Sequence, residues 1–182
     1  DTDDAIGSIS GAGNVKLYNA NKTLTVGGLG DDFTFSGLIK GDGSFTKDGS
    51  GVFTISRKNA LQLTGKTTVK NGTINFGATS PQAIDDLVVG KEGKVSNGKL
   101  TLGKLNNIGQ MTVASLSGTD LVNTFSNFGS IDIATSANID FKKGNDVFLT
   151  NSNLNFSGVL DGGEGVDLIK FGSLDNKLHP FR

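Results

Sequence analysis

The residues with the clearest chemical potential are acidic side chains that follow glycines. Residues 162–170 fit the calcium-binding nonapeptide Gly-Gly-x-Gly-x-Asp-x-apolar-x, and Asp146 ends the related segment Gly144-Asn145-Asp146. Calcium takes about six to eight oxygen ligands and is shared between adjacent turns of such repeats. Asp146 and Asp167 are therefore the candidate calcium ligands. The full nonapeptide occurs once, and turn geometry explains Gly and Asp without a metal, so we expect no metal site.

A second pair of acidic residues has the spacing of paired catalytic carboxylates. Asp140 precedes Asp161 by the same interval that separates Asp146 from Asp167, and glycoside hydrolysis needs two carboxyl groups about 5–10 Å apart. The residues that would hold a sugar are scarce, because the chain has one Tyr and no Trp. It also has no Cys and one His, His179, which excludes most thiol, zinc and triad chemistry. We predict a structural or binding protein with no catalytic residues and no cofactor.

Length and charge set further bounds. The chain has 182 residues, 27 of them Gly, and a formal net charge of −1. This length suffices for one domain with a core, and the near-zero charge argues against nucleic acid or an anionic membrane as a partner. Hydrophobic residues make up 35% of the chain and recur throughout it, so general disorder is not expected. No apolar run approaches the ~18 residues of a membrane helix.

Short segments in which polar and apolar residues alternate recur along the chain. Examples are Thr23-Leu24-Thr25-Val26 and Ser130-Ile131-Asp132-Ile133, and clusters of Gly, Asn, Asp and Ser separate such segments. Alternation of this kind predicts half-buried strands joined by turns. A sandwich, a barrel and a solenoid are all compatible with it. One segment differs: Ser80 could cap, and Pro81 could begin, a one-turn helical insert near residues 81–86.

Internal repeats favour the solenoid. Residues 69–77 match residues 95–103 with a shift of 26, and the element Gly-x-Asp-apolar-apolar begins at Gly118, Gly144 and Gly165, with shifts of 26 and 21. A repeat of this length holds about three short strands, which is one coil of a parallel β-helix. We therefore predict an all-β protein, a parallel β-helix of about seven to eight coils, with residues 1–182 as a single domain. The Gly-x-Asp coils span residues 118–175.

A longer pattern marks the first half of the chain. It contains the segments Ser36-Gly37-Leu38-Ile39-Lys40-Gly41-Asp42-Gly43-Ser44-Phe45-Thr46-Lys47-Asp48-Gly49-Ser50-Gly51-Val52-Phe53 and Thr64-Gly65-Lys66-Thr67-Thr68-Val69-Lys70-Asn71-Gly72-Thr73-Ile74. At about residues 7–77 the chain resembles the passenger-associated repeat of Gram-negative autotransporters, also called the autotransporter-associated β-strand repeat. Phe45 and Phe53 replace the Leu usual in that repeat, and residues 59–65 lack its usual Tyr.

The resemblance implies a right-handed parallel β-helix that is part of a larger passenger domain. It also implies type V secretion, in which the passenger crosses the inner membrane and then the outer membrane through the β-barrel of the parent chain. The expected location is extracellular, on the bacterial cell surface or secreted. The absence of Cys fits this route, because a disulfide-closed loop would obstruct passage through a narrow pore.

Outward-facing Thr and Asn residues are the candidate interaction face of such a helix. They are Thr73, Asn75, Thr101, Thr112, Asn153 and Asn155. The expected partners are a host cell surface or matrix, or a neighbouring β-helix through self-association, and the expected function is adhesion or aggregation. Three other functions remain open: a passive stalk or spacer within a larger passenger, a subunit region of a secreted toxin, and a polysaccharide-active enzyme.

Overall fold

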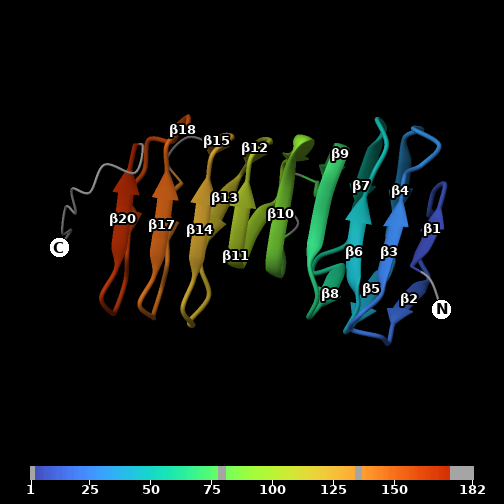
Figure 1. Ribbon diagram of the computed structural model, residues 1–182, viewed down its shortest axis with the longest axis horizontal. Coiled ribbons are helices and arrows are strands. Elements are labelled where there is room, and N and C mark those ends of the chain that lie inside the picture. Colours follow the sequence, from blue (N-terminus) through green and yellow to red (C-terminus); the bar gives the residue numbers. More distant parts are fainter. Residues whose placement is uncertain (1–2, 78–80, 134–136, 173–182) are drawn as a thin grey trace.

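The computed structural model describes residues 3–77, 81–133 and 137–172, and these residues contain strands and no helix. The chain winds into a rod whose coils stack from the N-terminal to the C-terminal end (Figure 1). All paired strands are parallel, each to a strand one coil away, and about eight coils are present. The predicted parallel β-helix is therefore confirmed. We call its three sides face A, face B and face C.

Face A is a continuous ladder of nine strand segments. They belong to β1 (Asp4–Ile6), β3 (Thr23–Val26), β6 (Ser44–Lys47), β9 (Thr67–Asn75), β10 (Pro81–Ser96), β11 (Lys99–Asn107), β14 (Thr124–Asn127), β17 (Val147–Thr150) and β20 (Leu168–Phe171). Aligned residues on this face are 18 positions apart between Leu87 and Leu105 and 23 apart between Phe125 and Phe148. Each coil thus takes about twenty residues.

Face B is a second continuous ladder. Its segments are β4 (Phe33–Phe35), β7 (Val52–Ile55), the second halves of β9 and β10, β12 (Gln110–Val113), β15 (Ser130–Ile133) and β18 (Leu154–Asn155). Strands β9 and β10 are long because they run through a corner and contribute to more than one face. Figure 1 shows the resulting side-by-side strands along the rod.

Face C is divided into two sheets. The first contains β2 (Asn14–Leu17), β5 (Leu38–Gly41) and β8 (Leu61–Leu63). The second contains the first residues of β10 and β11, followed by β13 (Ser115–Ser117), β16 (Ile139–Asp140) and β19 (Leu160–Asp161).

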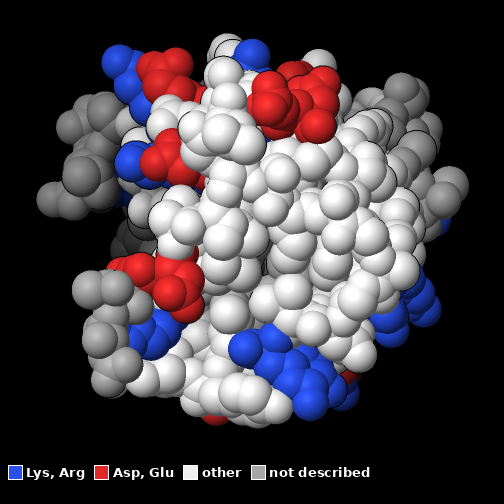
Figure 2. Space-filling view, turned by 90° about the vertical axis from the view of Figure 1, so that its right-hand side faces the viewer, with Lys and Arg blue, Asp and Glu red and all other residues white. Residues whose placement is uncertain are grey.

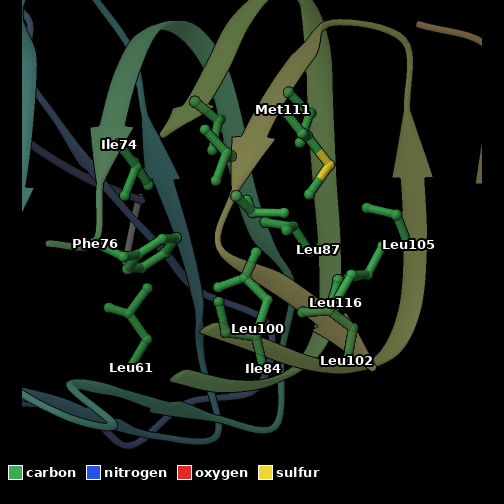
Figure 3. Packing of buried hydrophobic residues seen from close by; sticks show 14 of the residues in the cluster. Leu61, Ile74, Phe76, Ile84, Leu87, Leu100, Leu102, Leu105, Met111 and Leu116 are labelled. Atoms are coloured by element: carbon green, nitrogen blue, oxygen red, sulfur yellow. The ribbon is translucent and has the colours of Figure 1, made fainter. Parts of the chain in front are cut away.

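The core is a column of apolar side chains inside the rod. Alternate residues of every face point inward, so Leu87 and Leu105 from face A meet Met111 from face B and Leu116 from face C (Figure 3). Stacking also aligns aromatic rings from successive coils: the ring centroids of Phe33 and Phe53 are 4.7 Å apart. Burial of these side chains is the main stabilising contribution, at roughly 25 cal/mol per Å² of apolar surface.

The N-terminal end of the rod exposes its cross-section (Figure 2). Charged residues lie near the rim of this view, and the centre is uncharged. Ile9, Val15 and Leu17 of the first coil pack against the core but are only partly buried. The apolar interior of the stack therefore comes close to the surface at this end.

The predicted helical insert at residues 81–86 is wrong. Pro81–Ile84 pair with Lys99–Leu102 as a parallel strand, and burial alternates from buried Gln82 through exposed Ala83 to buried Ile84. An isolated helical turn fixes several residues for few hydrogen bonds, whereas a strand here gains a partner along its whole length. Pro81 is the first residue of the strand, where its missing N–H is tolerated. Ser80 lies outside the described residues.

The 26-residue shifts do not correspond to one coil of the rod, so that prediction is wrong. The 21-residue shift does correspond to one coil and is confirmed. Val69 aligns with Val89, so residues 69–77 and 95–103 occupy different faces. Asp120 does not align with Asp146 either. The corner position one coil before Asp146 is occupied by Asn123, whose N–H donates to the carboxylate of Asp146. The similar segments share a strand-and-turn composition, and the number of residues per coil follows from corner lengths that composition does not reveal.

A buried amide joins the two sheets of face C. Gln82 is 1% exposed; its Oε1 accepts the N–H of Ala60 at 2.9 Å, and its Nε2 donates to the carbonyl of Arg57 at 2.6 Å. The backbone contributes one bond here, from the N–H of Asn59 to the carbonyl of Pro81 at 3.0 Å. The side chain of Gln82 thus supplies hydrogen bonds where the strand ladder is interrupted.

We expect Gln82→Leu to lower the free energy of unfolding by about 1–3 kcal/mol, because the buried N–H of Ala60 and the partly buried carbonyl of Arg57 lose their partner. Urea unfolding followed by circular dichroism measures the change. The matched control is Gln110→Leu on the exposed side of face B, which should change stability by less than about 0.5 kcal/mol. Equal effects of the two substitutions would contradict the role assigned to Gln82.

Candidate functional site

A continuous row of polar side chains runs along the outside of face B. We call it the polar row; it consists of Thr34, Thr54, Asn75, Ser96, Thr112, Asp132 and Asn155, each aligned with the next. Three of the six predicted interaction residues, Asn75, Thr112 and Asn155, belong to it. Asp132 is its one charged member. Stacked parallel strands are about 4.8 Å apart, so the row presents regularly spaced hydroxyl, amide and carboxylate groups.

Two further predicted residues lie beside the polar row, and one lies elsewhere. Thr73 aligns with Val52 and Lys94 in the adjacent outward row. Asn153 precedes Leu154 of the same face, and its carbonyl accepts the N–H of Ile131 at 2.9 Å. Thr101 is on face C, where its Oγ1 is 3.1 Å from the Oγ of Ser117. The structure therefore brings five of the six residues together on face B.

One member of the polar row also stabilises the fold. The Oδ1 of Asn75 accepts the backbone N–H of Gly77 at 3.1 Å and the Nδ2 of Asn97 at 2.9 Å. Asn97 has a left-handed backbone with φ of 60°, which Asn tolerates better than most residues. Asn75 is thus partly committed to the turn that follows face B, whereas Thr112 and Asn155 are exposed.

Two shallow, open depressions lie on the described surface of the rod. One, of about 320 Å³, lies on face A between Lys66, Asp86 and Lys104. Another, of about 480 Å³, lies at the corner between faces A and B, next to Thr73, Glu92 and Lys94. Each contains a single carboxylate, so neither provides the acid and base pair of a glycoside hydrolase.

The predicted carboxylate pair Asp140 and Asp161 is formed, but its groups have local partners. The two residues align on face C. Asp140 accepts the backbone N–H of Lys142 at 2.9 Å and forms an ion pair with the Lys142 ammonium, and this hydrogen-bonded ammonium lowers the pKa of Asp140. Asp161 accepts the N–H of Gly163 at 3.0 Å. A general acid needs a raised pKa, so Asp140 is suited to turn stabilisation.

Asp146 and Asp167 stack at the corner between faces C and A, as predicted. The N–H of Asp146 donates to the Oδ1 of Asp167 at 2.9 Å. Asn123 occupies the same corner one coil earlier, and its N–H donates to the Oδ1 of Asp146 at 2.6 Å. Within the residues that the structure describes, no group of three or more His, Cys, Asp or Glu side chains could hold a metal ion.

A buried lysine lies at the corner between faces A and B. Lys47 is fully buried, and its Nζ donates to the carbonyls of Gly49 at 2.7 Å, Asp48 at 3.3 Å and Asn71 at 3.4 Å. Burial lowers the pKa of Lys47, and the carboxylate of Asp48 partly opposes this effect. The ammonium group thus satisfies backbone carbonyls of two successive coils.

The carboxylate of Asp48, the residue after this lysine, accepts hydrogen bonds from donors of the same corner. Asp48 accepts hydrogen bonds from Lys70 at 2.8 Å, from the Nδ2 of Asn71 at 2.5 Å and from the N–H of Gly49 at 2.9 Å. These donors, above all Lys70, lower the pKa of Asp48 from 3.8 to about 2. Lys47 and Asp48 therefore both stabilise the backbone of this corner.

A ladder of buried amides, which the alternating pattern does not predict, lies at this corner. Asn107 and Asn127 are fully buried; the Nδ2 of Asn107 donates to the Oδ1 of Asn127 at 2.8 Å, and the Nδ2 of Asn127 donates to the Oγ1 of Thr150 at 3.2 Å. The Oδ1 of Asn107 accepts the N–H of Gly109. The pattern Asn-x-Gly, which begins at Asn107 and again twenty residues later at Asn127, is the signal that could have revealed it.

Comparisons with known proteins add no relative: no family model, no curated protein and no solved structure matches the chain. Among the described residues, no helix is long and apolar enough to cross a membrane.

The lowered pKa of Asp48 predicts a pH-dependent contribution to stability. A carboxylate with a depressed folded pKa stabilises the protein above its ordinary pKa, here 3.8, and this contribution is lost as the pH falls toward about 2. We expect Asp48→Asn to reduce the free energy of unfolding by about 1–2 kcal/mol near neutral pH. The difference from the unmodified protein should shrink between pH 4 and pH 2.

Urea unfolding at a series of pH values measures this difference. Asp132→Asn, at an exposed position of the polar row, is the matched control that removes the same charge. A stability difference for Asp48→Asn that stays constant from pH 6 to pH 2 would contradict the assigned pKa.

Proposed function

We propose that this chain is an adhesive segment of the passenger domain of a Gram-negative autotransporter, displayed on the bacterial surface or secreted. The observation that carries the proposal is the polar row, which continues along face B from Thr34 to Asn155. A long, regular row with one charged member suits repeated hydrogen bonding to an extended partner. The resemblance of residues 7–77 to the passenger-associated repeat supports the cellular setting.

The partner that suits face B is a host cell surface or matrix, or face B of another rod. Each polar contact in water contributes only about 0.5–1.5 kcal/mol, so a single coil would bind weakly. Contacts repeated over several coils, and over many displayed copies, raise the overall avidity. Adhesion through face B therefore depends on several coils together rather than on one pocket.

A spacer is the second candidate function, and the coil-to-coil regularity favours it. Each strand pairs with strands of the adjacent coils, which gives a rod that holds another domain at a distance. In this case face B would be a solvated surface without a partner. The two candidates differ in one property, which is whether the isolated chain attaches to anything.

Attachment of beads coated with the 182-residue chain tests the proposal. The test variant carries Thr112→Arg, Asn153→Arg and Asn155→Arg, which place long charged side chains on face B. The control variant carries Asn106→Arg, Thr124→Arg and Ser126→Arg, which add the same charge to face A. Because Arg at these outward positions crowds the flat surface, we expect the test variant to lose at least about tenfold in attachment to epithelial cells or to other beads.

The control variant should retain the attachment of the unmodified chain. Circular dichroism and the unfolding midpoint establish that both variants are folded. If unmodified beads attach neither to cells nor to each other, adhesion by this segment is refuted and the spacer is the better account. Equal losses in the two variants would refute the assignment to face B.

A further inference from the structure

Two loops of similar backbone path stack at the corner between faces C and A. They are residues 141–146 and 162–167, which lead into β17 and β20 (Figure 1). Lys142 and Gly163 have φ values of 71° and 83°, and Gly144 and Gly165 have φ values of 135° and 146°. The loops are hydrogen-bonded to each other: the N–H of Gly144 donates to the carbonyl of Glu164 at 2.9 Å, and the N–H of Glu164 donates to the carbonyl of Lys142 at 2.8 Å.

A carboxylate oxygen is buried at this corner without a hydrogen-bond partner. Asp146 is 2% exposed. Its Oδ1 accepts the N–H and the Nδ2 of Asn123 at 2.6 and 2.8 Å, whereas its Oδ2 is inaccessible and has no partner. Burial of a charged oxygen without a compensating contact is costly. An additional positive group at Oδ2 would remove this cost.

The lysines of loop 141–146 are engaged by other carboxylates. Lys142 pairs with Asp140, and the Nζ of Lys143 is 3.2 Å from Glu164. Both lysine side chains are substantially exposed, while Asp146 is buried. Neither ion pair supplies the Oδ2 of Asp146 with a cation.

The preceding coil shows what a positive group can do at this corner. The Nδ2 of Asn123 donates to the carbonyls of Leu121 at 2.7 Å, Thr119 at 3.1 Å and Phe141 at 3.1 Å, and to the Oδ1 of Asp146. A partly positive amide group therefore gathers oxygen atoms from two coils. At the next coil the same corner position carries Asp146, and a carboxylate provides no such donor.

We propose that a calcium ion binds between loops 141–146 and 162–167. The Oδ2 of Asp146 is the anchoring ligand, and Asp167 and backbone carbonyls of the two loops are the further ligands. Calcium suits this donor set because it accepts carboxylate and carbonyl oxygens in a flexible geometry, whereas magnesium demands a near-ideal octahedron and retains water. Residues 162–170 also fit the calcium nonapeptide, and stacking on loop 141–146 supplies the adjacent turn that such a site needs.

Two carboxylates give a site of modest affinity, in the range of about 0.1–1 mM that is typical of extracellular calcium modules. Because the ion would bind the folded stack and not the unfolded chain, calcium should raise the unfolding midpoint. The proposal is independent of adhesion through face B, which involves another side of the rod.

Thermal unfolding of the EDTA-treated chain in 0–10 mM CaCl2, at constant ionic strength, tests the site. Because the stabilisation grows as the logarithm of one plus the ratio of the calcium concentration to Kd, we expect the midpoint to rise by about 3 °C or more at 10 mM, with half of that rise reached at about 1–2 mM. The same concentrations of MgCl2 should have less than half of this effect. An equal rise with both ions, or no rise with calcium, would overturn the proposal.

Asp146→Asn removes the anchoring oxygen and keeps the shape of the side chain. This variant should lose the calcium response and be at least as stable as the unmodified chain in EDTA, because an amide replaces the unpaired charge. Asp167→Asn should weaken the response. Asp132→Asn, which removes an exposed carboxylate from face B, should respond as the unmodified chain does.

A calcium response that survives unchanged in Asp146→Asn would overturn the assignment. If that variant does not fold, isothermal titration of the unmodified chain and of Asp167→Asn with CaCl2 decides the question. Saturable binding that is at least threefold weaker in Asp167→Asn supports the site, and binding that is absent or unaffected refutes it.

Discussion

The constraint on which this structure depends is that each strand finds its hydrogen-bond partners in the coils before and after it. Parallel pairing places equivalent residues directly above one another, so apolar residues form one interior column and polar residues form outer rows. At the corners the backbone turns away from this ladder. Buried polar side chains such as Lys47, Asn107 and Gln82 then satisfy backbone groups that the strands leave unpaired.

Much of the fold could be predicted from the sequence because alternation reports directly on burial. Segments such as Thr23–Val26 and Ser130–Ile133 form strands with the expected inward side chains. The prediction failed where local and long-range preferences compete. Ser80 and Pro81 resemble the start of a helix, but β11 offers residues 81–84 a parallel partner. The 26-residue shift failed because similar strands occupy different faces.

The candidate surfaces were predicted less completely, since alternation treats every polar residue as outward-facing. This assumption holds for Thr112 and Asn155. It fails at the corners, where Asn107 and Lys47 point inward among backbone carbonyls. Whether such a residue is inside depends on carbonyl groups contributed by another coil, about twenty residues away, so alternation within a single strand does not reveal it.

The stacking of coils along the rod also determines how the molecule responds to force. Tension that pulls on one end of the chain loads the outermost coil, and its hydrogen bonds to the next coil break a few at a time rather than together. Each detached coil of about twenty residues lengthens the chain by roughly 60 Å, because an extended residue spans ~3.4 Å while a stacked coil occupies only ~4.8 Å of the rod. A rod under such tension therefore unwinds and lengthens in coil-sized steps.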